Sequence, residues 1–290
     1  MNAFILQNRY LDPESGRISA YFSKLFILVG QASLQYCILD TEKNTFVALA
    51  DFHLSSSPKT PDSFYSEISQ LISQEEMLQK KYPSVVIGID TTLHTLVPAP
   101  FFDSGQSNKY LGFNFGFNAN EQVSADRIEE VDAYNIYAIP PGYLDVLHGN
   151  YREAAVFHRA SALIRAIFYH HKKNPGQASL FLNIREQFVD LVSFEGGRLV
   201  YFNSYACLGK EDILYYTLYT LEQLKMSADT VQLFISGMLD AGSDSHLLLE
   251  QYIHMVSFSE SLGSFAYSPL LKQMPAHRYE ELYALALCGS

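Results

Sequence analysis

The stretch Leu25-Phe26-Ile27-Leu28-Val29-Gly30 opens the part of the sequence that decides the fold. It is a continuous run of β-forming residues that ends at a glycine. Two further apolar runs follow, Leu34 to Leu39 and Thr45 to Leu54, and turn-forming residues such as Asp40-Thr41-Glu42-Lys43-Asn44 separate them. Short apolar runs divided by turn signals predict three consecutive strands in a meander.

A helix and a buried strand are predicted to follow this meander. Thr60 suits a helix N-cap, and Pro61 suits the first helical position. An apolar stripe at helical spacing then continues to about Lys80. Val85 to Ile89 is apolar on both faces, which is typical of a strand covered on both sides.

The second half of the chain repeats this order. Leu180 to Ile184, Phe188 to Phe194 and Leu199 to Ala206 are predicted strands, and Gly196-Gly197 indicates a hairpin between the last two. A predicted helix, Glu211 to Lys225, and a predicted strand, Val231 to Ile235, come next. Leu25 falls on Leu180 at an offset of 155 residues. Five elements in one order favour an internal duplication over coincidence between β-rich segments. We therefore expect two domains, 1–174 and 175–290.

The region between the halves is less regular. Residues 93–133 interrupt the first half and are predicted to be an insertion. Within it, Tyr110 to Phe117 alternates apolar with small or polar residues, and this period of two predicts a strand with one apolar face.

Composition excludes several classes of protein. The formal net charge is −11 and the pI is near 5.2, which disfavours partners with phosphate backbones and anionic membrane surfaces. No apolar run is long enough for a spanning helix, and the first residues do not predict a signal peptide. The three cysteines are far apart, and none of the nine histidines lies in a metal-binding motif. We expect a cytoplasmic protein with no metal site, no membrane insertion and no nucleic-acid partner.

Three strands followed by alternating helices and strands form a ribonuclease-H-like unit. Two such α/β units in tandem, each in βββαβαβα order, resemble the superfamily of ATPases that includes actin and hexokinase. The whole chain also resembles an uncharacterised family of Bacteroidetes bacteria with an actin-like ATPase fold, through Thr95-Leu96-Val97-Pro98 and Lys109-Tyr110-Leu111. The second half is similar to actin-like modules of bacterial pilus assembly. This resemblance implies a nucleotide cleft between the two domains.

The resemblance also implies where phosphate-binding residues should lie. Active members carry an acidic residue and a glycine in the first hairpin of each unit, and the carboxylate helps to hold Mg²⁺. Here the first hairpin has Leu28 in the acidic position, followed by Gly30 and Gln31. The second has the neutral Asn183, and Arg185 replaces the glycine. We therefore expect Mg²⁺-ATP hydrolysis by the family's route to be lost.

Three residues leave catalysis or nucleotide binding open. Asp90 ends the fourth predicted strand, where sugar kinases of the superfamily place a general base, although an Asp at a strand end also forms turns. Ser236 and Gly237 lie where the superfamily contacts adenosine, although a turn between strand and helix also needs such residues.

The sequence therefore supports two hypotheses of different classes. The first is a non-catalytic actin-like module that acts through protein–protein contacts, with a protein partner. The second is a nucleotide-binding protein or phosphotransferase with a rewired cleft that uses ATP. The tyrosines Tyr215, Tyr216 and Tyr219 bear on this choice, because Tyr at helical spacing suits either the rim of a core or a partner surface.

Overall fold

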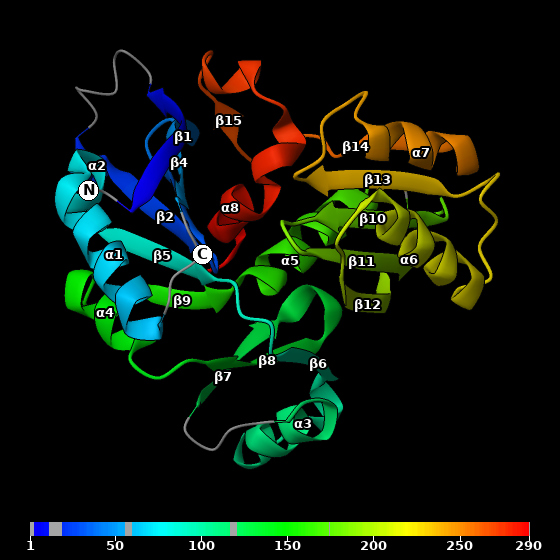
Figure 1. The fold of residues 1–290 in the computed structure, drawn as a ribbon, viewed down its shortest axis with the longest axis horizontal. Coiled ribbons are helices and arrows are strands. Elements are labelled where there is room, and N and C mark those ends of the chain that lie inside the picture. The colour runs from blue at the N-terminus through cyan, green and yellow to red at the C-terminus, as the bar shows by residue number, and fades with distance from the viewer. Residues whose placement is uncertain (1–2, 12–18, 56–59, 117–120, 174, 290) are drawn as a thin grey trace. The chain divides into compact units, whose positions relative to one another are not determined.

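The computed structural model describes residues 3–11, 19–55, 60–116, 121–173 and 175–289 (Figure 1). The chain divides into two compact units, each described by itself below. Unit 1 comprises Met1–Ala162, Gly263–Gln273 and Leu282–Ser290, and unit 2 comprises Leu163–Leu262 and Met274–Glu281. The division falls inside helix α5 (Arg159–His171) and differs from the expected boundary at 174–175. The units also differ from the expected domains near the C-terminus. Gly263–Gln273 belongs to unit 1 because its strand β15 (Ala266–Tyr267) pairs with β4 (Thr45–Leu54).

The sheet of unit 1 contains the predicted meander. Strands β2 (Ser23–Val29), β3 (Ser33–Asp40) and β4 are antiparallel, and β5 (Ser84–Ile89) and β9 (Ala155–His158) run parallel to β2 in the order β4-β3-β2-β5-β9. Strand β1 (Phe4–Leu11) lies antiparallel along the outer edge of β4 (Figure 1). The sequence did not predict β1, because its short apolar start runs into polar residues and most of its side chains stay at least partly exposed.

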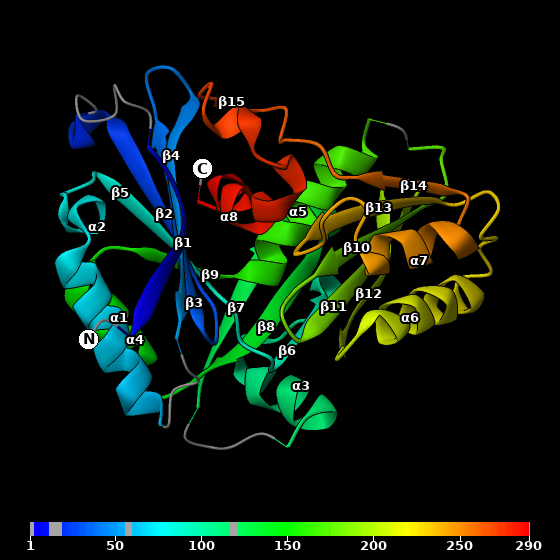
Figure 2. The same ribbon diagram turned by 45° about the horizontal axis from the view of Figure 1, so that its top comes forward.

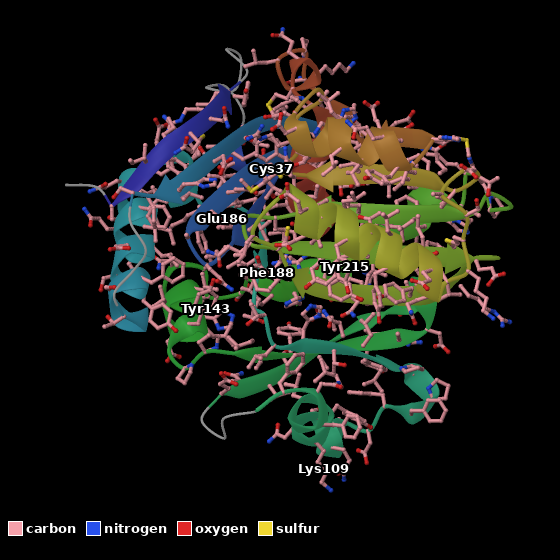
Figure 3. All side chains as sticks on the ribbon, turned by 45° about the vertical axis from the view of Figure 1, so that its right-hand side comes forward. Cys37, Lys109, Tyr143, Glu186, Phe188 and Tyr215 are labelled. Atoms are coloured by element: carbon pink, nitrogen blue, oxygen red, sulfur yellow. The ribbon has the colours of Figure 1, made fainter. Side chains whose placement is uncertain are left out.

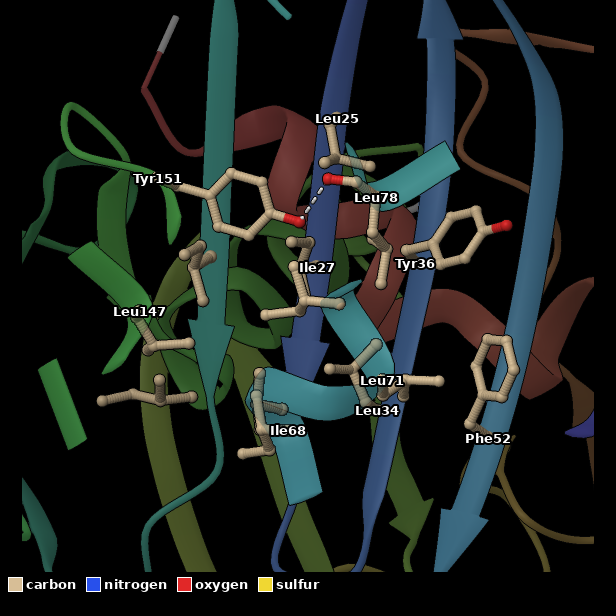
Figure 4. Packing of buried hydrophobic residues seen from close by; sticks show 14 of the residues in the cluster. Leu25, Ile27, Leu34, Tyr36, Phe52, Ile68, Leu71, Leu78, Leu147 and Tyr151 are labelled. Atoms are coloured by element: carbon tan, nitrogen blue, oxygen red, sulfur yellow. Dashed lines mark hydrogen bonds between the residues drawn. The ribbon is translucent and has the colours of Figure 1, made fainter. Parts of the chain in front are cut away.

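Helices α1 (Pro61–Gln74), α2 (Glu76–Gln79) and α4 (Tyr143–Asn150) belong to unit 1. The predicted helix start is confirmed, since the Thr60 side chain accepts a hydrogen bond from the Ser63 backbone. Figure 4 shows Ile68 and Leu71 of α1 packed with Ile27 of β2 in the main core. Burial of these apolar side chains is the main force that holds helices and sheet together.

The inserted region forms a small sheet in the order β6-β8-β7, built from β6 (His94–Pro98), β8 (Ala133–Ile139) and β7 (Gln122–Ile128). The predicted strand Tyr110–Phe117 is wrong, because residues Ser107–Asn114 form helix α3. The alternating residues do not share one face: Leu111 is buried against the small sheet, whereas Phe113 is 91% exposed. Phe117 lies outside the described residues.

The sheet of unit 2 contains β10 (Ser179–Ile184), β11 (Phe188–Glu195), β12 (Arg198–Ala206), β13 (Gln232–Gly237) and β14 (Met255–Phe258). Their order is β12-β11-β10-β13-β14. The predicted Gly-Gly hairpin is confirmed by the positive φ angles of Gly196 (54°) and Gly197 (80°). Helices α6 (Lys210–Gln223) and α7 (Asp244–Tyr252) lie side by side (Figure 2).

The two meanders agree in detail. Val29 pairs with Leu34 where β2 meets β3, and Ile184 pairs with Val189 where β10 meets β11, each 155 positions later. The register shift between Ile38 and Leu39 recurs between Ser193 and Phe194 at the same offset. The order of strands predicted for both halves is therefore present in both sheets. No described helix has the length and apolar character needed to span a membrane.

Candidate functional site

The candidate residues of unit 1 lie at the carboxyl ends of β2 and β5. Gly30 follows β2 and Asp90 follows β5, and the Asp90 backbone donates a hydrogen bond to the carbonyl of Val29. The carboxyl ends of parallel strands are where α/β sheets usually bind ligands. The structure thus brings Gly30 and Asp90 to one edge of this sheet, and Gln31 beside them is exposed.

Asp90 is held by a buried cation. Its Oδ1 accepts a hydrogen bond from Nε of Arg159 at 2.9 Å, and the Arg159 side chain has no exposed surface. The pKa of the nearby Tyr143 hydroxyl is raised well above its ordinary value, chiefly because Tyr143 is buried and also because Asp90 is negative. Arg159 directly follows β9 at the start of α5. Arg159 is a charged residue between an apolar strand and an apolar helix. This pattern could have indicated the ion pair from the sequence, but the sequence analysis did not use it.

A second polar cluster of unit 1 joins the small inserted sheet to β9 and α5. The buried carboxylate of Asp126 accepts hydrogen bonds from the Tyr137 hydroxyl (2.9 Å), the Ser161 hydroxyl (2.6 Å) and the His158 backbone (2.7 Å). Ser161 in turn accepts a hydrogen bond from Asn135, at 3.0 Å. Buried polar networks fix geometry when their members are satisfied. This network therefore fixes the sheet to the segment that carries Arg159, a role that the sequence did not predict.

The candidate residues of unit 2 meet at the carboxyl ends of β10 and β13. Asn183 pairs in register with Ser236, and its amide donates to the Ser236 hydroxyl at 2.9 Å. The other amide atom, Oδ1 of Asn183, is buried and has no hydrogen-bond partner among the described residues. Gly237 has a φ of +84°, and a Cβ there would lie 2.1 Å from the carbonyl oxygen of Ile184. The glycine is thus required by the backbone geometry itself.

A buried carboxylate lies beside these residues. Glu280, at the start of α8 (Glu280–Ala284), is 4% exposed and lies beside Ser236 and Ser259, whose hydroxyls favour its charged form. Burial raises the pKa of Glu280 to about 7, and the charge of Glu281 adds to the rise, while the two serines oppose it. Within the part of the chain that the structure describes, Oε2 of Glu280 has no hydrogen-bond partner. Sequence reasoning missed Glu280 because it lies 97 positions after Asn183 and enters the cluster only through the fold.

Arg185, which replaces the expected glycine, is neutralised within its own hairpin. Its guanidinium donates to both carboxylate oxygens of the fully buried Asp190, each at 3.2 Å, and it lies 4.9 Å from the centre of the Phe188 ring. Figure 3 labels Phe188 in this hairpin. Asp190 is a charged residue within a largely apolar strand, and this pattern could have indicated its ion pair with Arg185 from the sequence. Among the described residues, no three His, Cys, Asp or Glu side chains gather as a metal site.

Comparisons with known proteins agree on the fold. The chain is similar to a Bacteroides thetaiotaomicron protein with an actin-like ATPase fold and unknown function, at a TM-score of 0.77 and 20% identity over 92% of this chain and 96% of that one. It is also similar to a chain of a PilM–PilN type IV pilus biogenesis complex, at a TM-score of 0.57 and 13% identity, covering 91% and 97%.

A third structure, the ethanolamine utilization protein EutJ from Carboxydothermus hydrogenoformans, gives a TM-score of 0.50 and 12% identity, covering 92% and 90%. No curated protein matches the sequence. The fold is therefore the α/β fold of actin-like ATPases. A family model matches residues 14–256, and the chain thus belongs to the family described as Protein of unknown function (DUF3822).

Proposed function

We propose that this protein is a non-catalytic actin-like module of the cytoplasm that acts through contact with a protein partner. The observation that carries the proposal is that the charged candidate residues are held inside their own units. Arg159 pairs with Asp90 in unit 1, and Asp190 pairs with Arg185 in unit 2. A general base or a phosphate-binding cation must instead be available to a substrate.

The hairpins themselves support the same proposal. Leu28 and Asn183 occupy the positions of the Mg²⁺-binding acids, so neither hairpin offers a carboxylate there. The matching registers of the two meanders support an ancestral duplication, in which both copies then lost the acid. The solved relative in the PilM–PilN complex is bound to another protein, which supports contact as the mode of action.

A panel of ligands tests this proposal on the purified full chain. A ligand at 100 times its dissociation constant adds about 2.7 kcal/mol to the free energy of unfolding, which a thermal shift detects. We expect Mg²⁺ with ATP, ADP or GTP to leave the melting temperature unchanged. Mg²⁺-dependent ATP hydrolysis that is lost in Asp90→Asn would overturn the proposal. Affinity capture from the native cell tests the positive half, and we expect a stoichiometric protein partner.

One observation favours the alternative, a rewired nucleotide site. Glu280 supplies a carboxylate within hydrogen-bond reach of Ser236, which itself binds Asn183. An acid absent from β10 is thus present in the C-terminal segment. This alternative predicts that Mg²⁺-ATP stabilises the wild type and that Glu280→Gln removes the effect. We place the alternative second because Glu280 is buried, at 4% exposure.

A further inference from the structure

We propose that the exposed face of α6 is the docking site for an arginine-containing, basic segment of the partner protein. Four residues form this face, and together they are called the acid–tyrosine stripe: Glu211, Tyr215, Tyr219 and Glu222. This inference rests on the proposed function, because it names the surface and the kind of partner through which the module would act. All four residues belong to unit 2, so the surface is complete within that unit.

Helical spacing places the acid–tyrosine stripe on one side of α6. Its successive members are four, four and three positions apart, which is the spacing of neighbours on the surface of an α-helix. All four are exposed, Tyr215 to 61% and Tyr219 to 39%. The opposite side of the helix contains Ile213, Thr217 and Leu221, which are buried. The stripe is therefore the side of α6 that faces away from the core of unit 2.

The corresponding helix of unit 1 shows that the fold does not require such a face. α1 and α6 each follow the third strand of a meander and precede a strand that runs parallel to the first. The exposed residues of α1 at similar spacing are Ser66, Gln70 and Ser73, which are polar and neutral. Neutral polar residues thus suffice for the outer side of this helix. The acids and aromatic rings of α6 therefore indicate a role beyond folding.

The rings of the stripe are oriented by neighbouring rings, starting from the sheet. Tyr205 of β12, the equivalent of Phe52 by register, stacks on Tyr216 with 4.3 Å between the ring centres. Tyr216 packs edge to face with Tyr215 at 5.2 Å, and Tyr215 stacks on Tyr219 at 6.2 Å; Figure 3 labels Tyr215. Side chains that are already ordered lose little conformational freedom when a ligand binds. The exposed pair is therefore a preorganised aromatic surface.

Each ring of this pair lies beside one acid of the stripe. Glu211 is four positions before Tyr215, and Glu222 is three positions after Tyr219, so each carboxylate adjoins a ring on the helix surface. Among the described residues, neither carboxylate has an ion-pair partner. A guanidinium can stack on a tyrosine ring and also bind a carboxylate. The stripe thus provides two neighbouring places that fit arginine side chains.

The charge of the surrounding segment favours a basic occupant. Residues 208–254, which include α6 and α7, contain seven acids, two lysines and no arginine. Ion pairs with cations neutralise two of these acids, Asp244 through Lys210 and Asp240 through Arg278. The other acids outnumber the remaining lysine, Lys225. This part of unit 2 therefore attracts a positively charged segment and repels an acidic one.

The test measures the binding of labelled hexaarginine to the purified full chain by fluorescence anisotropy. The stripe is about 16 Å long at the rise of an α-helix, and an extended hexapeptide of about 20 Å covers it. An ionic strength of about 0.05 M keeps exposed charges from being fully screened. Hexalysine should bind about threefold more weakly than hexaarginine, because a planar guanidinium stacks on a ring better than an ammonium group does.

Two double variants of equal charge separate the stripe from the general negative charge of the chain. Glu211→Gln combined with Glu222→Gln should weaken hexaarginine binding about tenfold or more. The matched control combines Glu42→Gln with Glu186→Gln, which removes two exposed acids outside the stripe. It should change the affinity by less than about twofold, because separated surface charges are screened.

Tyrosine variants test the aromatic part of the stripe. Tyr215→Ser should weaken hexaarginine binding about threefold and remove most of the preference for hexaarginine over hexalysine. Tyr21→Ser is the matched control, since Tyr21 is 74% exposed in unit 1, and it should leave both affinities unchanged. Both rings are on the surface, so neither variant is expected to unfold the chain. An undiminished preference for hexaarginine in Tyr215→Ser would contradict the inference.

Three further results would overturn the inference. They are equal weakening by the two double variants, absence of binding at about 1 mM hexaarginine, and self-association of the chain that Tyr215→Ser abolishes, which would make a second copy the occupant. A captured partner that binds the Glu211→Gln, Glu222→Gln double variant and the wild type equally would also overturn it, yet would leave the proposed function standing. Nucleotide turnover without a partner would instead remove the proposed function.

Discussion

The third strands of the two sheets, β4 and β12, have the same place in the meander but opposite environments. β4 is covered along its outer edge by β1 and β15, and Phe46 to Phe52 are all buried. β12 has no such cover among the described residues, and all nine of its residues are half-buried or exposed. The difference shows that two strands in the same place of a meander can differ in which described strands pair with their outer edges and in how deeply their residues are buried.

The carboxyl ends of the two sheets differ in how each one compensates its carboxylate. In unit 1 the carboxylate of Asp90 pairs with the guanidinium of Arg159. In unit 2 the carboxylate of Glu280 is buried, and only the hydroxyls of Ser236 and Ser259 favour its charged form. An ion pair stabilises a buried carboxylate in its charged form, whereas two hydroxyls compensate the lost hydration only in part. The burial of Glu280 should therefore make the stability of unit 2 depend on pH.

The largest expected effect tests the covered edge against the open one. Phe52→Ala removes a buried ring that stacks on Tyr36, and such a change costs about 3–5 kcal/mol of the free energy of unfolding. Tyr205→Ala, at the equivalent position, should cost less, about 1–2 kcal/mol, because its half-buried ring loses the stack on Tyr216, the hydrogen bond with the Tyr201 hydroxyl and only part of a core contact. Urea unfolding followed by circular dichroism measures both, since the chain has no Trp. Equal losses would contradict the comparison.

An intermediate, pH-dependent effect is expected at Glu280. Its pKa rises from 4.5 to about 7 on folding, so its stabilising contribution is complete below pH 4.5 and is lost as the pH rises through 7. Glu280→Gln keeps a neutral side chain at every pH. The variant should match the wild type near pH 4.5 and exceed it above pH 7 by up to about 3 kcal/mol.

The sign of that difference decides the interpretation of Glu280. Other carboxylates titrate in both proteins and cancel in the difference between their unfolding free energies. The protonated acid can donate from Oε2, which has no partner among the residues that the structure describes, and the Gln amide reproduces that donor. A variant that is less stable than the wild type above pH 7 would show that Glu280 is needed in its charged form.

The smallest effect is expected on α6. Tyr215 is 61% exposed, whereas Tyr65 on α1 is 8% exposed and donates to the carbonyl of Pro141 at 3.0 Å. Tyr215→Ser should therefore change the free energy of unfolding by no more than about 0.5 kcal/mol. Thermal unfolding of the variant checks this. A larger loss would assign Tyr215 to the core of unit 2 and weaken the case for a partner surface.

Much of the fold could be predicted from local pattern. The two meanders, the Thr60 cap and the Gly-Gly hairpin were correct because each depends on residues close together in the sequence. The strand expected at Tyr110–Phe117 was wrong because alternation of apolar residues does not show which of them a neighbouring sheet will bury. β1 was missed because most of its residues stay at least partly exposed and its pairing with β4 joins distant positions in the sequence.

The candidate site was predictable only in part. The sequence placed Asn183, Ser236 and Gly237 as candidates, and the structure brings these three together. It could not show that Arg185 and Asp90 have ionic partners, although the residues are all visible in the sequence. Ion pairs such as that of Asp90 with Arg159 join positions 69 apart, and no local pattern encodes such a distance.

The sequence by itself determined the two α/β halves, their common order of strands and the replacement of the expected acid by Leu28 in one first hairpin and by Asn183 in the other. These properties follow from hydrophobic periodicity, turn residues and residue identity, which are local. Only the tertiary structure decided which edges are covered, which charges are paired and that Glu280 lies beside Ser236. Those outcomes depend on contacts between segments distant in the chain, whose burial and electrostatic energies exist only once the chain has folded.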